Sequence, residues 1–281
     1  MPINSLSTAI QAASTQSRVP LILNFEPRIG SASGSVPGTN GSLWCPSHLN
    51  TGRNGYIASP GAARNPTRTS PGMVGQANPA TGKKLYLASM KALNANTPAT
   101  FMLYDRLGDI SGLSGAVATS QTCNVTAGTR YPDAIGNEIW VEIFTTIGTT
   151  ATTITASYTN QDGVSGRTTQ PVAIGGSSGA LRSKISASPL PLQAGDKGVV
   201  SIQSISLAAS TGTAGDIGVT LARPIGETQT GGTLPGVTSF IASQPSLPEI
   251  KPDAALFFYG AIFAAANAGA AVVELNFWEE I

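Results

Sequence analysis

Short runs of β-branched and aromatic residues, broken by turn residues about every 10–20 positions, constrain the fold of this chain most strongly. The strongest run is EIWVEIFTTI at residues 138–147, and TTITASY at 152–158 follows it after a Gly-Thr-Thr turn. Because both runs are rich in strand-forming residues, we expect them to pair as an antiparallel hairpin. Further strand candidates are residues 19–25, 84–88, 100–104, 170–174, 198–208 and 215–223.

The spacing of these runs predicts the fold class. Turn signals recur too often for strands that alternate with long helices. The sequence therefore predicts an all-β fold, an antiparallel β-sandwich or jelly-roll-like structure with long irregular loops. The loops concentrate at residues 30–82, where Gly, Pro, Asn, Ser and Thr are dense and apolar residues are sparse. A segment of this length either has a role, such as wrapping over a partner, or is partly disordered.

The two ends of the sequence carry their own signals. Residues 4–16 place apolar side chains at helical spacing, which predicts a short N-terminal helix, either docked on a neighbour or packed on its own domain. Residues 254–273 are apolar over a length that suits a membrane helix, but Tyr259, Asn267 and glycines interrupt them. We therefore expect two buried strands around a turn at 267–269, and no membrane partner. No secretion signal is apparent, so no export is expected.

A chain of 281 residues is long enough for one large β domain or two smaller ones. The signals above divide it into three parts. Residues 1–100 form an N-terminal arm and loop-rich region, and residues 101–225 form a β-sandwich core. Residues 226–281 form a linker and a C-terminal strand pair that completes the sheet or an interface.

Low charge is the most unusual feature of the composition. Charged residues make up 11% of the chain, against about 25% in an average globular protein. With 16 basic and 15 acidic residues the net charge is +1. A surface built from Ser, Thr, Asn and Gln repels its own copies little and favours lateral assembly. Nucleic acid is not expected as a partner, because phosphate binding needs clustered Lys and Arg.

Catalytic residues are hard to find in this sequence. No Gly-x-Ser-x-Gly elbow leads from a strand into a helix. Asp105 and Asp109 flank Arg106, which we interpret as a loop fastened by an Asp–Arg pair. Glu138 and Glu142 share one face of a strand, where a solvent-facing or interface position is the ordinary explanation. We therefore expect no enzymatic activity, no catalytic residue, no cofactor and no bound metal.

Cysteine and histidine are scarce. Cys45, Cys123 and the single histidine, His48, are too few for a structural zinc site within one chain. Free buried thiols are the default in a reducing cytoplasm, and a disulfide between the two cysteines or between chains is the alternative. Aromatic residues leave open a glycan- or receptor-binding module with stacking platforms, although Trp140 and Trp278 are better interpreted as core residues. The platform candidates are Trp44, Tyr56, Tyr131, Trp140 and Trp278.

Three segments between residues 101 and 225 resemble a group of tailed-bacteriophage virion structural proteins, the head or capsid decoration-like family. They are LYDRLGDISGLSG at 103–115, the run from 142 to 176, and PLQAGDKGVVSIQSISLAASTGTAGDIGVTLARPI at 191–225. The most specific motifs are YTNQDG at 158–163, GRTTQ at 166–170 and GDIGVT at 215–220. Residues 1–100 and 226–281 take no part in the resemblance.

The resemblance implies a non-enzymatic virion component that assembles in the host bacterial cytoplasm. The leading hypothesis is a capsid decoration or cement protein, which stabilises the head by self-association, by analogy as a homotrimer, and by bridging capsomers of the major capsid protein. A neck or collar protein, or a tail, baseplate or fibre component, is the alternative placement. The family has no known catalytic residues to transfer to this chain.

Overall fold

The computed structural model describes residues 19–25, 39–42, 60–94, 98–176, 188–231, 236–239, 247–262 and 271–280. Every element bounded within these ranges is a β-strand. In chain order they are β1 (Val19–Phe25), β2 (Thr39–Ser42), β3 (Leu85–Asn94), β4 (Ala99–Leu113), β5 (Gln121–Thr126), β6 (Glu138–Thr145), β7 (Thr152–Asn160), β8 (Arg167–Thr168), β9 (Val172–Ile174), β10 (Val199–Leu207), β11 (Asp216–Thr230), β12 (Gly236–Ser239), β13 (Glu249–Ile250), β14 (Leu256–Ile262) and β15 (Ala271–Glu279).

These strands form three five-stranded sheets in which every pairing is antiparallel. Sheet I has the order β1-β15-β3-β12, with β13 also on β3. Sheet II has the order β2-β14-β4-β11-β6. Sheet III has the order β5-β10-β7-β8, with β9 also on β7. The expected all-β, antiparallel fold is confirmed, whereas the jelly-roll form stays a prediction and the helix at residues 4–16 lies outside the described residues.

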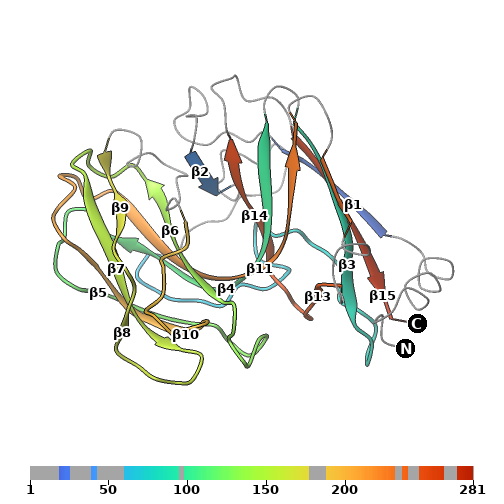
Figure 1. Cartoon of the computed structure of the whole chain (residues 1–281), viewed down its shortest axis with the longest axis horizontal. Helices are drawn as coiled ribbons and strands as arrows, with labels where there is room; N and C mark the ends of the chain where they lie inside the picture. Colours follow the sequence, from blue (N-terminus) through green and yellow to red (C-terminus); the bar gives the residue numbers. More distant parts are fainter. Residues whose placement is uncertain are drawn as a thin grey trace.

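Sheet II is shared by two hydrophobic cores. Its central strands, β4 and β11, are each 15 residues long and extend across both the half that faces sheet III and the half that faces sheet I (Figure 1). Around one half, sheet I packs on sheet II through residues such as Leu87, Leu103 and Phe258. Around the other half, sheet III packs on sheet II through residues such as Tyr158 and Val219. The chain is therefore two β-sandwiches joined by one continuous sheet.

The opposite face of sheet II carries an aromatic cluster. Tyr104, Trp140, Phe257 and Tyr259 pack with Met73, and all five are buried. The Trp140 and Phe257 rings each lie 4.8 Å from the Tyr259 ring between centroids. The Phe257–Tyr259 pair is edge-to-face, and such a pair adds about 0.5–1.5 kcal/mol beyond the burial of its area. The centre of sheet II is thus packed on both faces.

The expected hairpin between residues 138–147 and 152–158 is wrong, although both segments are strands. β6 pairs with β11 in sheet II, and β7 pairs with β10 in sheet III. Both strands bury one apolar face in the same core, and they do so from opposite sides of it. Gly148 makes this crossing possible, because a Cβ there would lie 1.8 Å from the Thr211 carbonyl oxygen. The turn is an arch between two sheets, which an alternating pattern cannot distinguish from a hairpin.

The apolar C-terminal segment contains two strands, as expected, but they do not pair with each other. β14 joins sheet II beside β4, and β15 joins sheet I between β1 and β3. The turn expected at 267–269 lies outside the described residues. The described part of the chain contains no helix of the length and apolarity that a membrane crossing needs.

Residues 60–84 are irregular, and hydrogen bonds attach them to other parts of their own chain. Gly61 N donates to Ser111 O at 2.9 Å, and Arg64 N and Asp109 N each donate to the other residue's carbonyl oxygen at 3.0 Å. Further along, Val74 N donates to Leu256 O at 2.9 Å. The described part of the expected wrapping segment therefore covers β4 and the start of β14. The rest of that segment, apart from β2, lies outside the described residues.

Candidate assembly surface and the buried polar junction

A buried ionic network lies where the two sandwiches meet. Arg106 on β4 is fully buried, and its Nε donates to Asp109 Oδ2 at 2.5 Å. Its Nη1 and Nη2 donate to the two carboxylate oxygens of Glu142 on β6, at 3.1 and 2.5 Å. Thr220 on β11 donates its hydroxyl to Glu142 Oε2 at 2.9 Å, and Arg64 Nε donates to Asp109 Oδ1 at 2.9 Å. Three strands and the irregular 60–84 segment are tied together at one point.

A second clamp lies next to the first on β4. Asp105 is buried and accepts two hydrogen bonds from Arg130, each 3.0 Å long. Arg130 also donates to Pro66 O at 3.0 Å and to Arg106 O at 2.5 Å. Ala255 N donates to Asp105 Oδ1 at 2.8 Å, just before β14 begins. Paired arrangements of guanidinium and carboxylate fix geometry as well as charge.

Burial and pairing act against each other on the ionisation of these groups. Burial lowers the pKa of Arg106, but the charges of Glu142 and Asp109 more than offset it, so the pKa lies above its ordinary value. Burial raises the pKa of Asp105, and the positive charge of Arg130 only partly opposes this. Burial also raises the pKa of Tyr259 well above its ordinary value, and the negative charge of Glu142 adds to the rise. Ionised partners are thus essential to keep the buried charges of this junction in place.

Glu138 opens β6 at the edge of the aromatic cluster. Its Oε2 accepts hydrogen bonds from the Tyr104 hydroxyl and from Trp140 Nε1, both at 3.1 Å. Burial raises the pKa of the Glu138 carboxyl, and the two donated hydrogen bonds lower it in part. The side chain is therefore a fixed acceptor for two aromatic donors.

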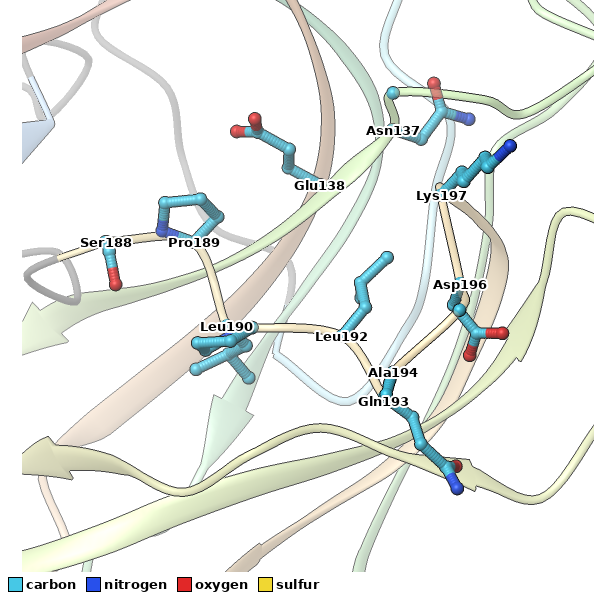
Figure 2. A pocket seen from close by; sticks show the side chains of 13 residues that line it. Asn137, Glu138, Ser188, Pro189, Leu190, Leu192, Gln193, Ala194, Asp196 and Lys197 are labelled. Carbon is cyan, nitrogen blue, oxygen red and sulfur yellow. The ribbon is translucent and has the colours of Figure 1, made fainter.

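A shallow hollow of about 530 Å³ lies beside Glu138, between residues 136–138 and the irregular strap 188–197 (Figure 2). Hydrogen bonds hold the strap to sheets II and III. Leu190 N donates to Ile139 O on β6, and Gln170 N, between β8 and β9, donates to Pro191 O, both at 2.8 Å. Among the described residues that line the hollow, none is a histidine or a cysteine. The hollow is lined mostly by apolar surface, and both of its carboxylates, Glu138 and Asp196, are bound to structural partners.

Asp196 fastens the far end of the strap to sheet III. It accepts hydrogen bonds from the Tyr158 hydroxyl at 2.5 Å and from Asn160 Nδ2 at 2.8 Å. Arg167 donates to it through Nε at 2.9 Å and through Nη2 at 3.2 Å. These donors, Arg167 first, lower the pKa of Asp196 to about 2. The YTNQDG, GRTTQ and QAGDKG stretches of the sequence therefore meet at one carboxylate.

The outer face of sheet III is a surface of a different kind, made of neutral polar side chains. Hydroxyl-bearing residues on neighbouring strands lie opposite one another and form rows across the sheet. One row is Thr126, Ser201 and Thr159; the next is Thr122, Ser204, Ser157 and Thr168; a third is Ser206 and Thr155. All of them are half-buried or exposed. The apolar residues between them on the same strands are buried in the core, whereas Asn124 and Gln203 stay at the surface. The one charged residue in the strands of this sheet is Arg167.

The structure separates the residues that the sequence singled out. The Asp–Arg pair expected at 105–109 exists between Arg106 and Asp109, but it lies inside β4 and not in a loop. Glu138 and Glu142 do share a face, yet Glu142 is buried at 1% exposure and does not face solvent. Sequence analysis did not identify Glu142 as the partner of Arg106. A carboxylate in a strand is normally expected at the surface. Only the repeated spacing of polar residues among apolar ones in β6 could have indicated an internal ion pair.

The aromatic and cysteine candidates fall mostly in the interior. Trp140 and Trp278 are core residues, as expected, and Tyr131 is buried with the Arg223 guanidinium 5.0 Å from its ring centre. Cys123 is a free, buried thiol, and burial raises its pKa to about 12. The remaining candidates, Cys45, His48, Trp44 and Tyr56, lie outside the described residues. Within the described part, no three His, Cys, Asp or Glu side chains gather as a metal site requires.

Comparisons with known proteins leave the chain's own residues as the evidence for its function. No protein-family model matches the chain, and no curated protein matches it. Among solved structures it is similar to VP2 of infectious bursal disease virus. A mutant VP2 is 12% identical over 94% of this chain and 78% of its own, with a TM-score of 0.21. A chain in the structure of the infectious bursal disease virus Gt strain is also 12% identical, over 94% of this chain and 79% of its own, with a TM-score of 0.23. At TM-scores this low the similarity identifies neither a shared fold nor a shared function.

Proposed function

We propose that this chain is a non-enzymatic structural protein of a bacteriophage virion, and that it acts as a capsid decoration or cement protein. It stabilises the head by associating with its own copies, as a homotrimer, and by bridging capsomers of the major capsid protein. It is made in the cytoplasm of the host bacterium and resides in the virion. Its energy of attachment comes from contact area and neutral hydrogen bonding, without chemistry on a substrate.

The observation that carries this proposal is where the charged residues lie. Asp105, Arg106, Asp109 and Glu142 are buried in the junction and bound to partners there. The surface of sheet III is left neutral and rich in hydroxyl groups. Such a surface has little self-repulsion, so many copies can lie side by side on one shell. An enzyme would instead need titratable side chains that line a cleft and can bind or react with a substrate there.

The resemblance to phage structural proteins supports the same proposal. The three segments that carry it contribute most of β4 and β11, the end of β6, and all of β7, β8, β9 and β10. β4 and β6 both pair with β11, and β7 pairs with β10. Those segments therefore meet in the sandwich of sheets II and III, whose residues build one core.

A reconstruction of virions that contain this chain tests the proposal. We expect density for the chain at regular positions on the outer head surface, in contact with the major capsid protein. Heads that lack the chain should lose their DNA at a lower temperature, and adding back the purified chain should restore their stability. Density confined to the neck or tail would overturn the decoration role and favour a collar, baseplate or fibre component. A glycan array with specific hits on the isolated chain would favour a receptor-binding module.

A further inference from the structure

The neutral face of sheet III is suited to meet a second copy of itself. In a two-fold contact the same patch occurs on both partners, so each residue near the axis lies opposite its own copy. A charged residue there would face a like charge, and such a pairing weakens an interface. Ser and Thr hydroxyls both donate and accept, so they can pair with their own copies. The hydroxyl rows centred on Ser204 and Ser157 satisfy this condition.

Other described surfaces do not offer the same property. The face of sheet I away from its core places Lys91 opposite Glu274, and Lys91 is exposed. A two-fold contact on that face would bring these charges toward their own copies. The neutrality of the sheet III face is therefore specific to it among the solvent-facing sheet surfaces that the structure describes.

The edges of sheet III are short or partly covered, which favours its face over its edges as a contact surface. At one edge, β8 and β9 have only two and three residues. At the other edge, β5 curls against β4, where Asn65 Nδ2 donates to Leu107 O at 2.7 Å and to Thr126 O at 2.8 Å. Gly108 permits this approach, because a Cβ there would lie 2.3 Å from the Thr126 carbonyl oxygen. Short or covered edges are how sheets avoid pairing edge to edge.

Two exposed apolar side chains add contact energy at one end of the face. Ile135 is 47% exposed and forms an isolated bridge with Gly198, and Val200 is 36% exposed two residues further along the same segment. Val199 between them is buried in the core, so Gly198 and Val200 lie on the outer side. A small apolar patch beside uncharged polar rows has the composition of an interface centre, from which charged residues are depleted.

We propose that the outer face of sheet III, defined by the hydroxyl rows together with Ile135 and Val200, is a two-fold interface between copies of this chain. This inference rests on the proposed function, because it adds a second surface of self-association to the three-fold contact proposed above. The two-fold contact is independent of a three-fold contact elsewhere. It therefore predicts dimers, or hexamers where a three-fold contact also forms.

The test uses the purified full-length chain and measures its mass in solution at micromolar concentrations. Ser204→Lys places a charge at the centre of the face, and we expect it to weaken association about 100-fold. Val237→Lys is the matched control, because Val237 is 64% exposed on β12 of sheet I and lies away from the face. That control should retain the oligomer of the wild-type chain.

A charge-swap pair separates a lost contact from a damaged fold. Ser204→Lys and Ser204→Glu should each be dissociated when alone, whereas equal amounts of the two should associate as a mixed dimer. A merely misfolded variant cannot be rescued in this way. Wild-type chains that are monomeric or trimeric would overturn the inference, as would an oligomer that Ser204→Lys leaves intact or a mixture that stays dissociated. The outcome is separate from the virion reconstruction, which locates the chain whatever its oligomeric state.

Discussion

The centre of sheet II and the outer face of sheet III treat polar groups in opposite ways. At the centre of sheet II, Arg106 and Glu142 are removed from water and bound to each other. On the outer face of sheet III, hydroxyl groups such as those of Thr155 and Ser204 stay at the surface and carry no charge. One region uses charge in the interior, and the other avoids charge at the exterior.

This difference teaches how a chain with 11% charged residues can use them. A buried ion pair adds little net stability, but it is costly to form with a wrong partner, so it selects one register of the strands around it. At the junction, that register fixes how the two sandwiches join. The outer face of sheet III needs no such selection. Its neutrality lets two copies of the chain approach each other without repulsion between like charges.

Removing the charge partner at the junction should give the largest effect on stability. Glu142→Gln leaves Arg106 buried beside an uncharged amide, and we expect a loss of about 3–5 kcal/mol in the free energy of unfolding. Urea denaturation followed by tryptophan fluorescence measures it. Glu227→Gln, on the exposed side of β11, is the matched control and should stay within about 0.5 kcal/mol. Equal losses in the two variants would show that the junction charges are not special.

The arch that carries sheet III away from sheet II should be the next most sensitive point. Gly148→Ala puts a Cβ within 1.8 Å of the Thr211 carbonyl oxygen, so we expect a loss of about 3 kcal/mol. Gly163→Ala is the control, because its φ is 78° but nothing lies within 4 Å of the added Cβ. Backbone strain alone should cost about 1 kcal/mol there. Thermal unfolding of both variants separates a clash from strain, and a milder effect at position 148 would contradict the arch geometry.

Acid should weaken the attachment of the strap of residues 188–197 to sheet III. Because the pKa of Asp196 is held at about 2, below its ordinary value of 3.8, its ion pair stabilises the folded chain above about pH 4. That contribution is lost as the pH falls toward 2. We expect Asp196→Asn to lower the unfolding temperature at neutral pH and to reduce its fall between about pH 4 and pH 2. A variant with the same acid dependence as the wild type would contradict this assignment.

The Cys123 thiol, beneath the neutral face of sheet III, should give the smallest effect, because only its rate of chemical labelling should depend on folding. Cys123 is buried and burial raises its pKa to about 12, so it should react slowly with a disulfide reagent in the folded chain. A Cys45→Ser variant isolates the signal of Cys123. We expect no labelling in buffer and complete labelling in concentrated urea. Rapid labelling in buffer would mean that sheet III opens readily.

Local sequence predicted strands well and their partners poorly. The run at 19–25 is β1 as expected, and 198–208 contains β10, because a short run rich in β-branched and other apolar residues is a local signal. β4 was expected to end near Tyr104, but it continues to Leu113. Residues 105–113 contain two glycines and three charged residues, which locally favour a loop. They form a strand because they pair with β11 and because partners elsewhere in the chain bind their charges.

The arrangement of strands into sheets depends on contacts that no single segment contains. Residues 138–147 and 152–158 carry the same alternation whether they lie side by side or face each other across a core. The close packing of Gly148 on Thr211 decides between these two forms, and it involves residues 63 positions apart. The neutral face of sheet III was predictable only as a composition, since its rows depend on the register of β5, β7 and β10.

The pairing of distant strands also sets the order in which this chain can fold during its synthesis. Ala99 on β4 donates its N–H to a Thr230 hydroxyl on β11, 131 positions later, and β1 pairs with β15. The ribosome must therefore release the first strands long before their neighbours exist. Folding dominated by such distant contacts is slow, and unpaired apolar strands are prone to aggregate while they wait. Nascent chains of this protein should consequently depend on chaperones until β15 has emerged.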